Sequence, residues 1–204
     1  MTRTRLIAFA AAVLLVAACG QLGGQQGAPD LYTLSPAAVG SSSTAPVAWQ
    51  LAVDEPVAPG GLDSNRVVAM PAPRELKYVF NMRWIDAAPK MIQSLLVQSF
   101  EKSGRIRAVD RQSVGQHADF LLKTELRDFQ AEYFGGAAIP TVHVRLQAKL
   151  VRLPREAMID MREFEMTVKP QSGKPSDLVA GFDEALGRVM ADIVTWALAV
   201  PVQR

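Results

Sequence analysis

The sequence predicts an α+β fold, and three observations support this prediction. Residues 87–102 and 177–199 carry apolar side chains at helical spacing, so each predicted helix buries one face against a sheet. Several other segments alternate apolar and polar residues with the period of two that is typical of strands. The length of 204 residues and the apolar content of 49% suit one domain with its own core.

Residues 1–18 have the pattern of a secretory signal peptide. Arg3 and Arg5 precede an uninterrupted apolar run from Leu6 to Ala18. As a helix this run would span roughly 20 Å, which is less than the roughly 30 Å of a bilayer's hydrocarbon core. Removal of the signal lowers Lys plus Arg from 22 to 20, which equals the 20 acidic residues. A formally neutral mature chain offers no basic field that would favour nucleic acid as a partner.

The apolar run ends in Val16-Ala17-Ala18-Cys19, which resembles the bacterial lipobox. This pattern predicts cleavage after Ala18, a diacylglyceryl group on the sulfur of Cys19 and a further acyl chain on its freed amine. Several acyl chains anchor a protein stably, whereas one chain binds only marginally. The alternative is an ordinary secretory signal with an accidental cysteine. Because Cys19 is the only cysteine, the sequence excludes an intramolecular disulfide and a cysteine-based metal site.

The residues after the cysteine bear on the location of the protein. In enterobacteria an Asp at this position retains lipoproteins in the inner membrane. Gly20 stands there instead, which favours the periplasmic face of the outer membrane. Residues 19–29 are predicted to be a flexible tether, because residues 20–29 contain four Gly and three Gln, and such a chain spans roughly 17 Å on average. The folded domain then comprises residues 30–204.

The first part of this domain is predicted to contain short strands separated by Pro and Gly, over residues 30–36, 50–53, 66–70 and 76–84. In the last of these strands, Leu76, Tyr78 and Phe80 share one side. The first helix begins near Ala87 with Asp86 as its N-cap and stops before Gly104. A short strand over residues 106–110 follows.

Long strands and a long helix are predicted for the second part. In residues 118–133 the apolar side chains change parity, which predicts a bulge near Arg127-Asp128. Residues 141–150 alternate cleanly, with four polar residues facing outward: His143, Arg145, Gln147 and Lys149. One wet face fits antiparallel pairing, and residues 158–168 are the predicted partner strand.

The last helix, over residues 177–199, is predicted to be capped by Ser176. It carries an apolar seam at heptad-like spacing: Val179, Phe182, Leu186, Val189, Ile193, Trp196 and Val200. The seam fits a core helix on the sheet, and the alternative is a helix–helix contact with another subunit.

The sequence contains no recognisable catalytic constellation. His117 and His143 have no metal-ligand spacing, and no nucleophile elbow is present. We therefore expect no enzymatic activity, metal or cofactor. A periplasmic hydrolase would require four residues to converge in one cleft: Asp119, Glu125, Asp128 and His117. Seven basic residues can form either a docking surface or a dispersed solubility surface: Arg105, Arg107, Arg111, Arg127, Arg145, Lys149 and Arg152.

Several short blocks, in their order and spacing, resemble the ABC-type transport auxiliary lipoproteins, which are PqiC-like components of MCE lipid-transport systems. The blocks cover roughly residues 30–200 and comprise Tyr32-Thr33-Leu34-Ser35-Pro36, residues 61–68, Tyr78 through Arg83-Trp84, Asp86, Ser103-Gly104, residues 118–122, Glu125-Leu126, Asp128-Phe129 and Trp196. One departure is Asn81-Met82, where the family pattern has a more polar pair.

The resemblance implies a single α+β domain with a mixed or mostly antiparallel sheet and two main helices packed on one side. It also implies an outer-membrane lipoprotein that docks or receives the tunnel of an MCE-domain protein. An inner-membrane permease and a separate ATPase would complete the transporter. A homo-oligomeric ring around the tunnel is an expectation by analogy alone. The remaining alternatives are an assembly lipoprotein of another outer-membrane complex, such as one for lipopolysaccharide export, and the hydrolase.

Overall fold

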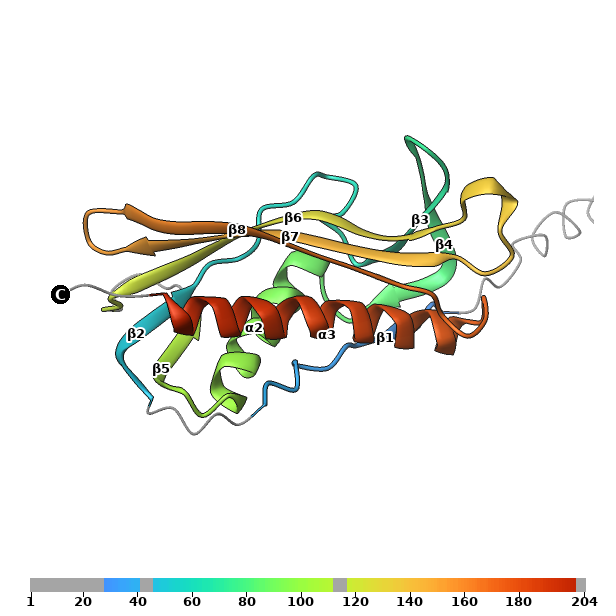
Figure 1. Cartoon of the computed structure of the whole chain (residues 1–204). Coiled ribbons are helices and arrows are strands. Elements are labelled where there is room, and N and C mark those ends of the chain that lie inside the picture. The colour runs from blue at the N-terminus through green and yellow to red at the C-terminus, as the bar shows by residue number, and fades with distance from the viewer. Residues whose placement is uncertain (1–27, 41–45, 112–116, 201–204) are drawn as a thin grey trace, which may run out of the picture.

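A computed structural model of the chain describes residues 28–40, 46–111 and 117–200. The predicted signal peptide, the cleavage site at Ala18, the lipidation site Cys19 and the tether up to Gly27 lie outside these ranges. Within them the chain forms one α+β domain with an open, mixed sheet of eight strands and two α-helices (Figure 1). The predicted fold class is therefore confirmed.

The strands of the sheet in chain order are β1 Asp30–Tyr32, β2 Val47–Val53, β3 Arg66–Ala72, β4 Glu75–Trp84, β5 Ile106–Arg111, β6 Phe120–Glu132, β7 Thr141–Arg152 and β8 Ala157–Val168. The helices are α2 Ala88–Lys102 and α3 Pro175–Ala199, and a short 3-10 turn, η2 Phe134–Gly136, follows β6. The first strand ends at Tyr32 rather than at the predicted Pro36. Its ladder with β4 stops there because Tyr32 pairs with Trp84, the last residue of β4.

Strand β6 organises the sheet. One of its edges pairs with β7 along the whole strand, in antiparallel direction, and β7 pairs in turn with β8. The other edge is divided, because residues 120–122 pair with β2 and residues 130–132 pair with β3, both in parallel. The sheet thus splits into one wing of β2 and β5 and another of β3, β4 and β1. The predicted bulge is confirmed by a register shift between Leu126 and Asp128.

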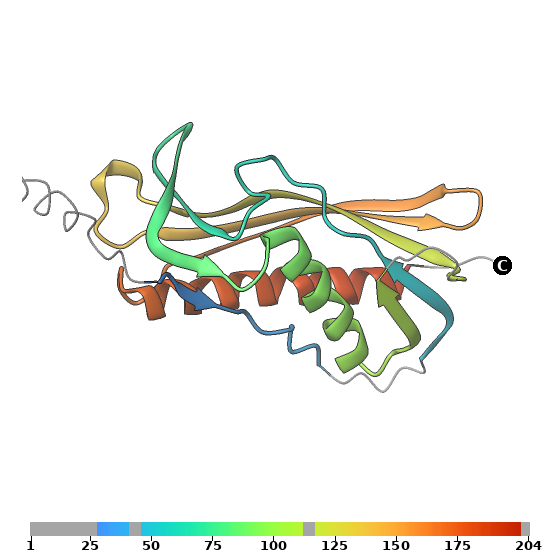
Figure 2. The ribbon, with the colours of Figure 1, turned by 180° about the vertical axis from the view of Figure 1, so that it is seen from behind.

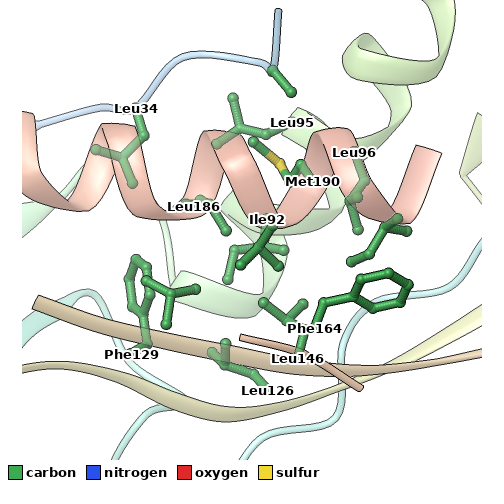
Figure 3. Close-up of a cluster of buried hydrophobic side chains, with 14 of the residues drawn as sticks. Leu34, Ile92, Leu95, Leu96, Leu126, Phe129, Leu146, Phe164, Leu186 and Met190 are labelled. Atoms are coloured by element: carbon green, nitrogen blue, oxygen red, sulfur yellow. The ribbon is translucent and has the colours of Figure 1, made fainter. Parts of the chain in front are cut away.

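Both helices lie on the same side of the sheet (Figures 1 and 2). Helix α3 packs on β7 and β8, while α2 packs on β5 and β2 and also contacts α3. The predicted seam of α3 therefore packs mainly on the sheet, as expected for a core helix. In the core, the rings of Trp84, Phe129 and Phe182 meet with centroids 4.9–5.5 Å apart. Figure 3 shows the aliphatic side chains of the two helices, including Ile92 and Leu186, above Leu126 and Leu146 of the sheet.

Both predicted helix caps are wrong. The N-cap of α2 is Ala87, which offers no side-chain hydrogen bond, and Asp86 instead accepts a hydrogen bond from Lys90 Nζ at 3.3 Å. The N-cap of α3 is Lys174 rather than Ser176. A proline stands in the first turn of each helix, where its fixed φ suits the helix and its missing N–H is not needed. The prolines thus mark these helix starts better than the capping residues do.

Candidate functional site

The residues that a hydrolase would need do not converge. Asp119 precedes β6, and its Oδ2 accepts a hydrogen bond from the backbone N–H of Gln50 at 2.8 Å. Asp128 lies nine residues further along the same extended segment, which corresponds to roughly 30 Å. His117 is exposed beside a hollow of about 380 Å³ at the Asp119 end. Among the described residues, no group of three or more His, Cys, Asp or Glu side chains has an arrangement that could hold a metal ion.

The seven basic residues do not form one free surface. Arg107 and Arg111 lie on β5, at the edge of the sheet, and Arg111 Nη2 donates to Ser94 Oγ at 2.8 Å. Arg127 forms an ion pair with Glu163 across β6, β7 and β8. Arg145 forms an ion pair with Asp128, and its Nη1 lies 3.8 Å from Glu163 Oε1. Carboxylates therefore neutralise part of the predicted patch.

The face of the sheet opposite the helices, here called the outer face, carries a ladder of paired charges. The alternating burial along β7 confirms that His143, Arg145, Gln147 and Lys149 point away from the core. His143 lies between carboxylates of the two neighbouring strands: its Nδ1 is 2.9 Å from Glu132, and its Nε2 is 2.6 Å from Glu165. Only the protonated ring can donate to both carboxylates at once.

This charge ladder comprises Arg127, Asp128, Glu132, His143, Arg145, Glu163 and Glu165, and it shifts the pKa of His143 and of Asp128. Burial alone would lower the pKa of His143, but the hydrogen bonds to Glu132 and Glu165 and the nearby negative charges outweigh burial and raise it. Burial would raise the pKa of Asp128, but hydrogen bonds from Gln130 and Arg145 outweigh that effect and lower it. These charges satisfy one another, as expected for a structural network rather than for a reactive site.

The hairpin of β3 and β4 carries Phe80, the most exposed large apolar side chain in the described part of the chain. Leu76, Tyr78 and Phe80 share one side of β4, as predicted, and they are 45%, 38% and 81% exposed. The alternation alone could not predict their exposure. Met82 and Trp84 stand at the same alternate positions of β4, and these two side chains are buried. Asn81 explains why the exposed residues give way to buried ones. Its φ of 57° interrupts the extended backbone, so that alternate side chains after it point to the opposite face of the sheet. An Asn inside an apolar run is the one signal that the sequence offers for this break.

Two neighbouring residues extend this surface. Leu31 of β1 pairs with Arg83 of β4, and Ile85 follows β4 directly; both side chains are more than half exposed. We call these five residues the hairpin patch: Leu31, Leu76, Tyr78, Phe80 and Ile85. Basic groups border it, because the Arg66 guanidinium lies 4.5 Å from the centre of the Tyr78 ring. A hollow of about 320 Å³ brings Pro29 together with Tyr78, Phe80 and Arg83.

In the described ranges, neither α2 nor α3 is sufficiently long and apolar to cross a membrane.

Comparison with known proteins places these features in context. Residues 32–194 match the model of a family described as the ABC-type transport auxiliary lipoprotein component. The crystal structure of a protein from Xanthomonas campestris, assigned to family model DUF330, is similar with a TM-score of 0.77 and 30% identity, over 84% of this chain and 95% of that one. Another crystal structure, of an uncharacterised protein, has a TM-score of 0.66 at 17% identity over 84% and 99% of the two chains, and therefore shows the fold alone.

A relative from Bradyrhizobium diazoefficiens is also uncharacterised. It is 28% identical over 148 residues, which are 72% of this chain and 39% of the relative. This chain therefore spans about two fifths of that relative's length.

Proposed function

The chain belongs to the family of ABC-type transport auxiliary lipoprotein components, and from this premise we propose that it serves as the membrane-anchored docking component of a lipid transporter. In this role the domain docks or receives the tunnel of an MCE-domain protein. That protein works with an inner-membrane permease and ATPase, and the lipoprotein itself carries out no catalysis. The observation that carries the proposal is a family match over nearly the whole domain, directly downstream of a lipobox.

The anchor in this proposal is Cys19, at the periplasmic face of the outer membrane. Cleavage after Ala18 makes Cys19 the new N-terminus, and acylation of its sulfur and amine supplies more than one chain. More than one acyl chain is what a stable anchor requires. Gly20 supports the outer rather than the inner membrane, because the retention residue Asp is absent at that position.

Lipidation is tested by the mass of the mature N-terminus. The full-length chain should yield an N-terminal peptide that begins at Cys19 and carries the acyl mass, and the protein should stay in the membrane fraction. Cys19→Ser is the matched variant, because it changes one atom of the chain's only cysteine. We expect it to keep the uncleaved signal and to lack the acyl mass. A wild-type N-terminal peptide without acyl groups would contradict the proposed anchor.

The docking role is tested by purifying the tagged, full-length lipoprotein from its native membranes. An MCE-domain protein should be recovered with it, together with the permease and the ATPase under mild solubilisation. Reproducible absence of an MCE-domain protein would count against the proposal. Recovery of a β-barrel protein in its place would favour the assembly lipoprotein of another outer-membrane complex.

A further inference from the structure

We propose that the hairpin patch is a membrane contact, which lies in the headgroup region of the bilayer that holds the anchor; this proposal rests on the proposed lipidation of Cys19. The partner it commits to is a lipid surface, rather than a second copy of the chain or another protein. Two independent observations support it: where the tether joins the domain, and which side chains lie there.

The point where the chain enters the domain lies beside the patch. Asp30 pairs with Met82, and Pro29 lines the same hollow as Tyr78 and Phe80. The side chain of Asn81 also reaches Asp30, with Nδ2 to Oδ2 at 3.5 Å. The hairpin is thus at the end of the molecule where the described chain begins, and the turn between β7 and β8 is at the opposite end (Figures 1 and 2).

The length of the tether limits how far this end can move from the bilayer. Nine Cα–Cα steps lead from Cys19 to Ala28, so even a fully extended tether reaches only about 30 Å. On average, a flexible chain of this length spans roughly 17 Å. The twelve residues of β7 run roughly 40 Å from the hairpin end toward the β7–β8 turn. Of the two ends, the hairpin end is therefore held closer to the lipid surface.

The side chains of the patch match the chemistry of a bilayer interface. Tyr places an apolar ring among acyl chains and keeps its hydroxyl at headgroup level, and Phe, Leu and Ile add apolar area that can enter the interface. Four basic residues of the hairpin can contact lipid phosphates: Arg66 and Arg83, which line the same hollow as Tyr78 and Phe80, Arg74 in the turn between β3 and β4, and Lys77 of β4. Three acidic residues are also near: Asp30, Glu75, which pairs with Lys77 at 2.7 Å, and Asp86, which follows Ile85 and pairs with Lys90 at 3.3 Å. The local charge is thus net positive.

Five side chains alone would bind a protein from solution only weakly to a bilayer. The anchor changes this, because it keeps the hairpin patch close to the lipid. The anchor turns the second contact into an intramolecular event, with an effective concentration in the millimolar range for a short flexible linker. A small aromatic patch can therefore hold the domain in one orientation on the membrane.

The experiment uses the full-length, anchored chain in vesicles of phosphatidylethanolamine and phosphatidylglycerol. Once Cys19 is acylated the chain has no free thiol, so Phe80→Cys supplies one site for a nitroxide label. Met158→Cys is the matched control, because Met158 is also a large apolar residue, 60% exposed, at the opposite end of the domain. Collisions of each label with oxygen, which concentrates in lipid, are compared with collisions with a water-soluble nickel chelate.

We expect the oxygen-to-nickel ratio at position 80 to exceed that at position 158 several-fold. Equal ratios, with wild-type protein that takes up no label, would overturn the membrane contact and leave the anchor intact. Exclusion of both reagents at position 80 would place the patch against protein and would also overturn the proposal. If wild-type protein itself takes up label, Cys19 is free, and the proposed anchor and the membrane contact both fail.

Discussion

His143 makes the stability of the protein depend on pH. Its pKa is raised above the ordinary value of 6.5, so its contribution is complete below that value and is lost as pH rises through the raised pKa. We predict that His143→Gln lowers the free energy of unfolding by about 1–2 kcal/mol near pH 6 and by less at pH 9. Urea denaturation at the two pH values measures this difference.

His117→Gln is the control for this prediction, because His117 is exposed and lies outside the ladder. It should leave the free energy of unfolding unchanged at both pH values. A His143→Gln effect that is constant between pH 6 and pH 9 would show that the ring charge does not matter. The alternation of β7 predicts that His143 faces outward, but it cannot predict Glu132 and Glu165, since these partners come from other strands.

Phe182 and Phe80 have opposite surroundings and allow a second test. Phe182 is fully buried against Trp84 and Phe129, so Phe182→Ala should cost about 3–5 kcal/mol of stability. Phe80 is 81% exposed, so Phe80→Ala should change stability by less than about 0.5 kcal/mol. The comparison is made by urea denaturation of both variants. A large loss for Phe80→Ala would mean that the hairpin patch is part of the core.

At the scale of the element, two glycines of α3 should respond in opposite ways to the same substitution. A Cβ at Gly181 would lie 2.9 Å from Pro170 Cγ and 3.2 Å from Val142 Cγ2, whereas a Cβ at Gly187 meets nothing within 4 Å. Gly187→Ala should stabilise the protein by about 0.5–1 kcal/mol through helix propensity. Gly181→Ala should instead destabilise it by about 1 kcal/mol, because overpacking outweighs propensity.

Thermal and urea denaturation of the two glycine variants check this prediction. Equal stabilisation by both substitutions would contradict the close approach of α3 to β7. The sequence predicts α3 and its buried seam, because the apolar spacing is local. It does not show that a Cβ at Gly181 has no room, since that depends on Val142, which is distant in the chain, and on how the loop before α3 places Pro170.

The same limit applies to the sheet. The bulge in β6 was predictable, because a change of parity is visible in the residues themselves. The division of the β6 edge between β2 and β3 was not, because the pairing of strands far apart in sequence leaves no local pattern. The hairpin patch was hidden for a related reason: Leu76 through Trp84 read as one alternating strand, and only the backbone at Asn81 separates its exposed half from its buried half.

At the scale of the whole molecule, the start of the domain lies beside the hairpin patch. The mature chain is formally neutral, yet basic residues gather around the patch, so net charge alone hides a local field. The lipobox predicts that the protein is held at a membrane, but it carries no information on orientation. The proposed orientation rests on the pairing of β1 with β4, which brings Pro29 to the same hollow as Phe80.

A longer tether separates the role of the anchor from the role of the domain. We predict that a second copy of residues 20–27, inserted after Gly27, changes the free energy of unfolding by less than about 0.5 kcal/mol, because the described sheet begins at Asp30. The insertion lengthens the tether from eight to sixteen residues between Cys19 and the residue now numbered Ala28. The effective concentration of the patch at the bilayer should then fall about two- to threefold.

Urea denaturation and the nitroxide label at position 80 measure the two effects on the same lengthened chain. A clear loss of stability would place residues 20–27 within the folded domain and move the predicted boundary. Complete loss of the oxygen-to-nickel difference would mean that a short tether, rather than the affinity of the hairpin patch for lipid, keeps the hairpin at the membrane. A modest decrease at unchanged stability is expected if the domain binds the bilayer through its own side chains while Cys19 holds it nearby.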